Sequence, residues 1–121
     1  MPLILQEEVA HFETMIYLPM VLIILERDRT LIEKGSFKLE RPYLELVEGA
    51  IKQARKELIG TKLYMRKRHM KLLKGIGDDI FTEYIFYHEG WEEHRRYLNI
   101  RLRNHVEELL RVYLAMSYNE I

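Results

Sequence analysis

The feature that most constrains the fold is a seam of mostly apolar side chains in residues 42–69, spaced alternately three and four residues apart. Its members are Leu44, Val47, Ile51, Ala54, Leu58, Thr61 and Met65. This spacing places all of them on one face of an α-helix, and a seam of this length packs against a partner helix at a shallow angle. Pro42 suits the first helical turn, where its missing amide hydrogen is not needed. The sequence therefore predicts a long helix over 42–69 with a second helix beside it.

Two glycines, Gly49 and Gly60, fall inside this predicted helix. Glycine costs about 1 kcal/mol relative to alanine in a helix interior. Such a glycine either lets another helix approach closely, or it occupies an exposed position where the cost is tolerated. Both explanations stay open for both residues.

The partner helix is predicted at residues 5–33, with Gly35 ending it. Its apolar residues fall on two faces: Val9, Phe12, Ile16, Pro19 and Ile23 on one, and Met15, Leu18, Leu22 and Leu25 on the other. The middle of this helix is therefore apolar all round, which is typical of a helix buried between several neighbours. Pro19 lacks an amide hydrogen and is expected to kink the helix about one turn earlier.

Residues 70–88 fit two kinds of structure. A turn cluster at 75–79 precedes a run at 80–88 that is rich in aromatic and β-branched residues, as strands prefer. Residues 70–74 are long enough to form the other strand of a hairpin. The run also fits helical spacing, through Phe81, Tyr84, Ile85 and His88. The β-hairpin is favoured, and the helix stays open as the alternative.

Beyond Gly90, residues 91–98 are predicted to form a short helix with its charges outward, and Asn99 is predicted to be the N-cap of a last helix that ends near Ser117. The last helix has an apolar stripe of Leu102, Val106, Leu109, Leu110 and Tyr113, opposite Arg103, Asn104, Glu107 and Arg111. The predicted fold class is therefore mainly α. We expect a single helical domain over residues 1–121, built as a small helical bundle: a long helical hairpin plus C-terminal helices, with a β-hairpin near 70–88.

Composition narrows the classes of function. The chain has 121 residues, of which 48% are hydrophobic and 31% charged, an ordinary globular balance. It has no cysteine, which excludes disulfides, thiolate metal sites and a cysteine nucleophile. The N-terminus has no secretory signal pattern, and the longest apolar run, residues 15–25, is shorter than the roughly 20 residues of a membrane-spanning helix. These features predict a cytoplasmic protein without a membrane partner.

Two basic groups, in residues 62–74 and 95–103, are candidates for binding nucleic acid. They consist of Lys62, Arg66, Lys67, Arg68, Lys71 and Lys74, and of Arg95, Arg96, Arg101 and Arg103. A structural explanation is favoured, because cations complement the dipole at a helix C-terminus and long basic side chains cover apolar surface. The formal net charge of zero and the lack of a recognition motif also weigh against a dedicated nucleic-acid-binding protein. Acidic protein partners are the remaining alternative.

Five histidines raise the question of a metal site. Glu8 and His11 have the Glu-x-x-His spacing that di-iron bundles use twice, but this chain has one such motif. The candidate ligands are Glu8, His11, His88, Glu92, His105 and Glu108. Ordinary surface pairs on helices are the favoured explanation of these residues, and a metal site is the alternative. No serine nucleophile motif or phosphate-binding loop is found, so no cofactor is predicted and nothing argues for an enzyme.

The aromatic side chains of residues 81–97 and the apolar first helix favour an interaction surface. Aromatic groups of this kind are more often core or interface anchors than stacking platforms for bases. A few short elements leave an all-round apolar helix incompletely enclosed, and a second copy of the chain would cover it. The leading interpretation is a non-enzymatic cytoplasmic interaction or accessory protein that self-associates and binds an unidentified protein. A nucleic-acid-binding accessory protein is the second hypothesis, and a small metal-dependent enzyme is the third.

Two parts of the chain carry a resemblance to a known group of proteins. One combines residues 17–29 (YLPMVLIILERDR) with 41–46 (RPYLEL), and the other runs from 88–99 (HEGWEEHRRYLN) into 101–104 (RLRN). Together they resemble a family of small uncharacterised proteins of Bacillus-type, spore-forming bacteria, over most of the chain. The resemblance implies a cytoplasmic accessory protein and brings no catalytic motif, cofactor or partner.

Overall fold

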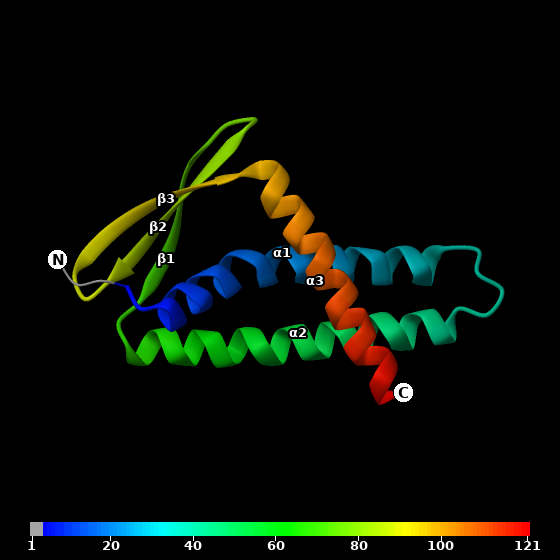
Figure 1. Ribbon diagram of the computed structural model, residues 1–121. Helices are drawn as coiled ribbons and strands as arrows, with labels where there is room; N and C mark the ends of the chain where they lie inside the picture. Colours follow the sequence, from blue (N-terminus) through cyan, green and yellow to red (C-terminus); the bar gives the residue numbers. More distant parts are fainter. Residues whose placement is uncertain (1–3) are drawn as a thin grey trace.

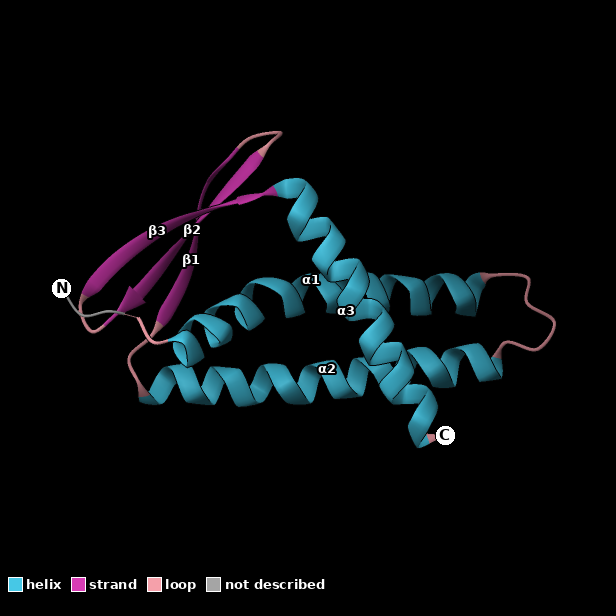
Figure 2. Cartoon of the chain, in the orientation of Figure 1, coloured by secondary structure: helices cyan, strands magenta, loops and turns pink. Residues whose placement is uncertain are grey.

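The computed structural model describes residues 4–121 as three helices and one three-stranded antiparallel sheet (Figure 1). The elements are α1 (Gln6–Lys34), α2 (Arg41–Lys67), β1 (Lys71–Gly77), β2 (Phe81–His88), β3 (Trp91–Leu98) and α3 (Asn99–Glu120). Helices α1 and α2 form a long antiparallel hairpin, and α3 crosses it. The sheet lies at the end of the hairpin where α1 begins and α2 ends (Figure 2). Residues 1–3, part of the N-terminus searched for a secretory signal, lie outside the described residues.

The predicted helical hairpin is confirmed. Six of the seven seam residues of α2 are buried, from Val47 to Met65, and Leu44 is half-buried. Val47, Ile51, Ala54 and Leu58 pack with Leu18, Val21 and Leu25 of α1 in a core that α3 completes with Val106 and Tyr113. Each large apolar side chain buried in this way contributes about 1.5–3 kcal/mol to folding.

A second core lies between the sheet and the N-terminal half of α1. Phe12 and Phe86 stack with ring centroids 4.3 Å apart, and both are fully buried. Ile16, Met65 and Leu102 close this core around them. The N-terminal half of α1 is therefore covered from two directions, by the helices and by the sheet, because its apolar residues occupy two faces.

The hairpin favoured for residues 70–88 is confirmed, and the helical alternative is wrong. Strands β1 and β2 pair in antiparallel register, with Leu73 opposite Ile85 and an irregularity between Lys74 and Gly77. At the turn, the Asp78 carboxylate accepts hydrogen bonds from the amides of Ile80 (2.8 Å) and Phe81 (2.7 Å). Both hydrogen bonds lower the pKa of Asp78, and the one from Phe81 has the larger effect.

The short helix predicted for residues 91–98 is wrong, because these residues form strand β3. Its pairing with β2 is uninterrupted, from His88 opposite Trp91 to Phe81 opposite Leu98. The connection is the two-residue turn Glu89-Gly90, in which both residues have positive φ, the geometry that suits a tight β-hairpin. The many charges of residues 91–98 led to the wrong prediction, because an edge strand with one face in water tolerates charges as an exposed helix does.

Asn99 is not the N-cap of the last helix. Leu98 holds that position, and α3 follows β3 without a loop. The Asn99 side chain instead donates to the Asp78 carbonyl oxygen (2.8 Å) and accepts from the Thr82 hydroxyl (2.6 Å). Asn99 therefore fastens the start of α3 to the β1–β2 turn.

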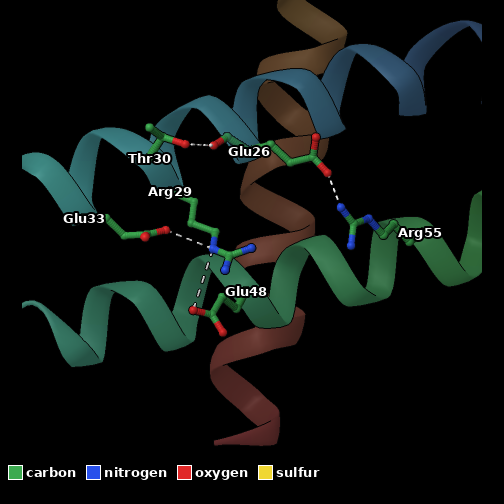
Figure 3. A network of polar contacts seen from close by, with 6 residues as sticks. All are labelled: Glu26, Arg29, Thr30, Glu33, Glu48 and Arg55. Carbon is green, nitrogen blue, oxygen red and sulfur yellow. Dashed lines mark hydrogen bonds and ion pairs between the residues drawn. The ribbon is translucent and has the colours of Figure 1, made fainter.

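A network of ion pairs covers one side of the α1–α2 hairpin, with α3 on the other side (Figure 3). Arg29 lies 3.2 Å from Glu33 and 3.9 Å from Glu48, and Arg55 bonds the Glu26 carboxylate. Exposed pairs of this kind contribute only about 0.2–1 kcal/mol each. They keep this side of the hairpin charged and hydrated.

The two helix glycines have different explanations, and this difference can be tested. A Cβ atom at Gly49 would overlap the Ser117 hydroxyl, which donates to the Leu46 carbonyl oxygen at 2.7 Å, whereas a Cβ atom at Gly60 would meet nothing within 4 Å. Gly49→Ala is expected to destabilise the protein by about 1–3 kcal/mol through overpacking. Gly60→Ala, its matched control, is expected to stabilise it by up to about 1 kcal/mol. Urea unfolding measures both, and equal effects would contradict the assignment.

Candidate functional site

The structure brings together two of the six predicted metal ligands. His88 Nε2 lies 2.5 Å from Glu8 Oε2. His11 lies apart from them: its Nδ1 is 3.1 Å from the Thr61 hydroxyl, and its ring stacks on Tyr64. The two residues of the Glu-x-x-His motif thus have different partners.

Of the other three predicted ligands, one lies on β3 and two are neighbours on α3. Glu92 is 3.2 Å from His94 on β3, while His105 on α3 is 3.7 Å from Glu108 and meets the Tyr17 ring edge-on. Within residues 4–121, no group of three or more His, Asp or Glu side chains is placed to hold a metal ion. The predicted ligands therefore serve as local pairs in this fold.

The Glu8–His88 pair joins the start of α1 to the end of β2. Its side chains are 6% and 7% exposed, and the other Glu8 oxygen accepts the Leu5 amide at 2.9 Å. His88 Nδ1 is buried and has no hydrogen-bond partner among the described residues. Glu8 thus satisfies a free amide at the helix N-terminus and a buried histidine at once.

The outer face of the sheet carries a second polar cluster. His94 of β3 lies between two carboxylates, with Nδ1 3.1 Å from Glu83 and Nε2 3.2 Å from Glu92. The hydrogen bond to Glu83, followed by that to Glu92, raises the pKa of His94 above its ordinary value. The two carboxylates engage opposite nitrogens of the ring, so they do not converge on one point.

The predicted basic residues are spread over several elements. Arg68 lies over the Tyr64 ring and Arg96 over the Phe81 ring, at 3.8 and 4.2 Å from the centroids. Arg95 bonds Glu93 at 2.6 Å, and Arg103 lies 3.8 Å from Glu107. The others, which are exposed, are Lys62, Arg66, Lys67, Lys71, Lys74 and Arg101. Nucleic-acid binding through these residues stays a prediction.

An apolar cleft of about 480 Å³ lies where the sheet, α1 and α3 meet. Figure 1 shows how these elements are arranged, with α3 leaving the end of β3 and crossing α1. Its apolar lining comes from Met20, Ile24, Tyr84, Leu102, Val106 and Leu110, and its polar lining from Lys74, Thr82, Asn99, Arg103 and Glu107. Its size and mainly apolar lining are typical of small-molecule sites.

Sequence reasoning missed this cleft. It treated Leu102, Val106 and Leu110 as one packing stripe, Asn99 as a helix cap and Lys74 as part of a basic group. No local pattern reports the angle between α3 and the sheet, and that angle creates the space between them. The sequence signal for such a cleft was the number of apolar residues on the predicted helices, which exceeds what the few neighbouring elements can bury.

Helix α1 also leaves apolar side chains uncovered. Ile23 and Leu31, which we call the α1 outer row, lie two turns apart and are 67% and 59% exposed. An 18-residue window of α1 has a mean hydropathy of 1.5, with 33% of it buried. By length and composition the helix is able to cross a membrane, a property that it shares with core helices of globular proteins. The expectation that several neighbours bury this helix is thus only partly met.

Breaking the buried pair should be costly. Glu8→Ala leaves His88 buried without its partner and frees the Leu5 amide, so we expect a loss of about 3–5 kcal/mol in unfolding free energy. Glu7→Ala, at the exposed neighbouring position, is the control and should cost less than about 1 kcal/mol. Urea unfolding followed by circular dichroism measures both, and similar losses for the two variants would refute the role of Glu8.

The cluster on the outer face makes a prediction about pH. His94 should titrate above 6.5, its ordinary pKa, because both carboxylates favour the imidazolium. A raised pKa means that the contribution to stability is complete below about 6.5, provided the carboxylates are ionised, and disappears as pH rises through the folded value. Histidine resonances followed by NMR should show the His94 pKa fall in Glu83→Gln and stay unchanged in Glu89→Gln. An unchanged value in Glu83→Gln would contradict the assignment of the raised pKa to the Glu83 hydrogen bond.

Comparison with known proteins identifies relatives of the chain. Residues 3–118 match the model of a protein family described as YhjD protein. The chain is 40% identical over 111 residues to "Uncharacterized protein YhjD" of Bacillus subtilis (strain 168), covering 91% of this chain and 92% of that protein. No solved structure matches. The resemblance to a family of Bacillus-type bacteria is confirmed, and the chain belongs to the YhjD protein family.

Proposed function

We propose that the protein is a non-enzymatic interaction protein of the cytoplasm that self-associates through the α1 outer row. The observation that carries the proposal is the exposure of Ile23 and Leu31, 67% and 59%, on a helix with a window of mean hydropathy 1.5. Covering such side chains releases about 25 cal/mol for each Å² of apolar surface removed from water.

Charge supports the same proposal. The formal net charge is zero, so two copies approach without net repulsion. The hairpin side that carries the Arg29 and Arg55 ion pairs is charged, whereas the α1 outer row has one cation, Arg27, between its two apolar members. Apolar contact surrounded by polar residues is typical of interfaces between subunits.

The molar mass of the protein in solution tests whether it self-associates. Light scattering after size exclusion should give a mass above that of the monomer in the micromolar range, and Ile23→Glu should shift it to the monomer because it places a charge in the interface. Ile59→Glu is the matched control, because Ile59 on α2 is exposed to a similar extent, 60%. A monomeric wild-type protein in that concentration range would rule the proposal out. Equal dissociation by both variants would show that the α1 outer row is not the interface.

A protein partner is tested by affinity capture from bacterial lysate, with and without nuclease. A protein that is retained by wild type after nuclease treatment, and lost with Ile23→Glu but not with Ile59→Glu, supports an interaction function of this surface. Recovery of nucleic acid, with bound proteins released by nuclease, contradicts it. The basic groups would then be the binding surface, and binding should weaken steeply with salt.

A further inference from the structure

The apolar cleft has features of a binding site that self-association does not use. Its floor is formed by Met20 and Ile24 of α1, and its wall by Val106 and Leu110 of α3. Ile23 and Leu31 are not among its lining residues. Ligand binding in the cleft is therefore independent of the proposed self-association, and either can fail without the other.

The polar groups of the cleft are of two kinds. Thr82 and Asn99 bond one another at 2.6 Å, and Asn99 also bonds the Asp78 carbonyl oxygen, so they form a fixed wall with their hydrogen-bonding groups engaged. Lys74 and Tyr84, by contrast, make no side-chain hydrogen bond or ion pair with residues 4–121. They are free to bind a ligand.

Lys74 and Tyr84 are also neighbours. They are direct partners in the β1–β2 register, and both line the cleft. Directly opposed residues on adjacent strands have Cβ atoms about 4.5–5.5 Å apart. Burial raises the pKa of Tyr84, so its hydroxyl keeps its proton as a donor at neutral pH. The Lys74 ammonium and the Tyr84 phenol are both donors on the lining of the cleft, and such donors suit a carboxylate.

The charged residues that line the cleft also favour an anionic ligand. Its lining contains two cations, Lys74 and Arg103, and one carboxylate, Glu107. Arg103 is already close to Glu107 at 3.8 Å and bonds Asn104 at 3.2 Å, so among the described lining residues Lys74 is the cation that is left to attract an anion. An apolar hollow with a cation and a hydroxyl available at its edge matches a molecule that is apolar over most of its length and acidic at one end.

We propose that the cleft binds a fatty-acid-like ligand, a single hydrocarbon chain that ends in a carboxylate. The carboxylate lies between Lys74 and Tyr84, and the hydrocarbon chain covers Met20, Ile24 and Leu110. Ionic attraction and hydrogen bonds select the acid over a neutral chain, while burial of the chain supplies most of the binding free energy.

The test uses dansyl-labelled undecanoate as the fluorescent probe, with unlabelled decanoate and decanol as competitors below their aggregation concentrations. Wild type should bind one probe per chain, and decanoate should displace it about tenfold better than decanol, since each 1.4 kcal/mol corresponds to a factor of ten. Lys74→Gln should weaken probe binding about tenfold, the effect of losing one charge-assisted hydrogen bond. Lys71→Gln is the matched control, because Lys71 lies on β1 opposite Tyr87, on the other face of the sheet.

Further variants separate the possible results. Leu110→Trp fills the cleft from a half-buried position and should abolish binding while the circular dichroism spectrum is retained. Ile23→Glu should bind the probe as wild type does, whatever its oligomeric state. The proposal is overturned if the probe does not bind saturably, if Lys74→Gln and Lys71→Gln bind equally, or if decanol competes as well as decanoate. Undiminished binding by folded Leu110→Trp would also overturn it, because the ligand would then lie elsewhere.

Discussion

The packing of the N-terminal half of α1 against two layers at once is the constraint on which the remaining structure depends. Phe12 stacks on Phe86 of the sheet, while Leu18 and Val21 belong to the core shared with α2 and α3. The Glu8–His88 pair fixes the register of helix and sheet at the outer end of this contact. Because both members are buried, an arrangement that separates them leaves a polar group without its partner.

Strand β3 continues directly into α3, so the position of the sheet also determines the position of α3. No loop separates Leu98 from Asn99, so the direction of the strand decides where the helix goes. Asn99 ties the junction to the β1–β2 turn through Thr82 and the Asp78 carbonyl oxygen. As a result α3 leaves the sheet and crosses the hairpin (Figure 1). Residues of the sheet, α1 and α3 together line the apolar cleft.

The surfaces of the helical hairpin differ in a way that bears on function. On one side, long charged side chains around Arg29 and Arg55 keep the helices hydrated (Figure 3). Along α1, Ile23 and Leu31 stay exposed. Apolar residues scattered singly over a surface need no partner, and the proposed self-association gives these two a common one.

The sequence by itself determined where the three long helices lie and how α1 and α2 pair, because helical periodicity is a property of a short stretch of chain. For residues 70–88 it favoured a hairpin through the turn residues but left a helix open, and the strand pairing decided between them. Tertiary structure alone decided that residues 91–98 form a strand, since their charges are tolerated only at an edge paired with β2. It also gave Gly49 and Gly60 different roles through the position of Ser117. The Glu8–His88 pair and the Lys74–Tyr84 edge of the cleft depend on packing and strand register, which bring residues distant in the chain together. Local spacing carries no information on such contacts, which are set by the way whole elements cover one another's apolar faces.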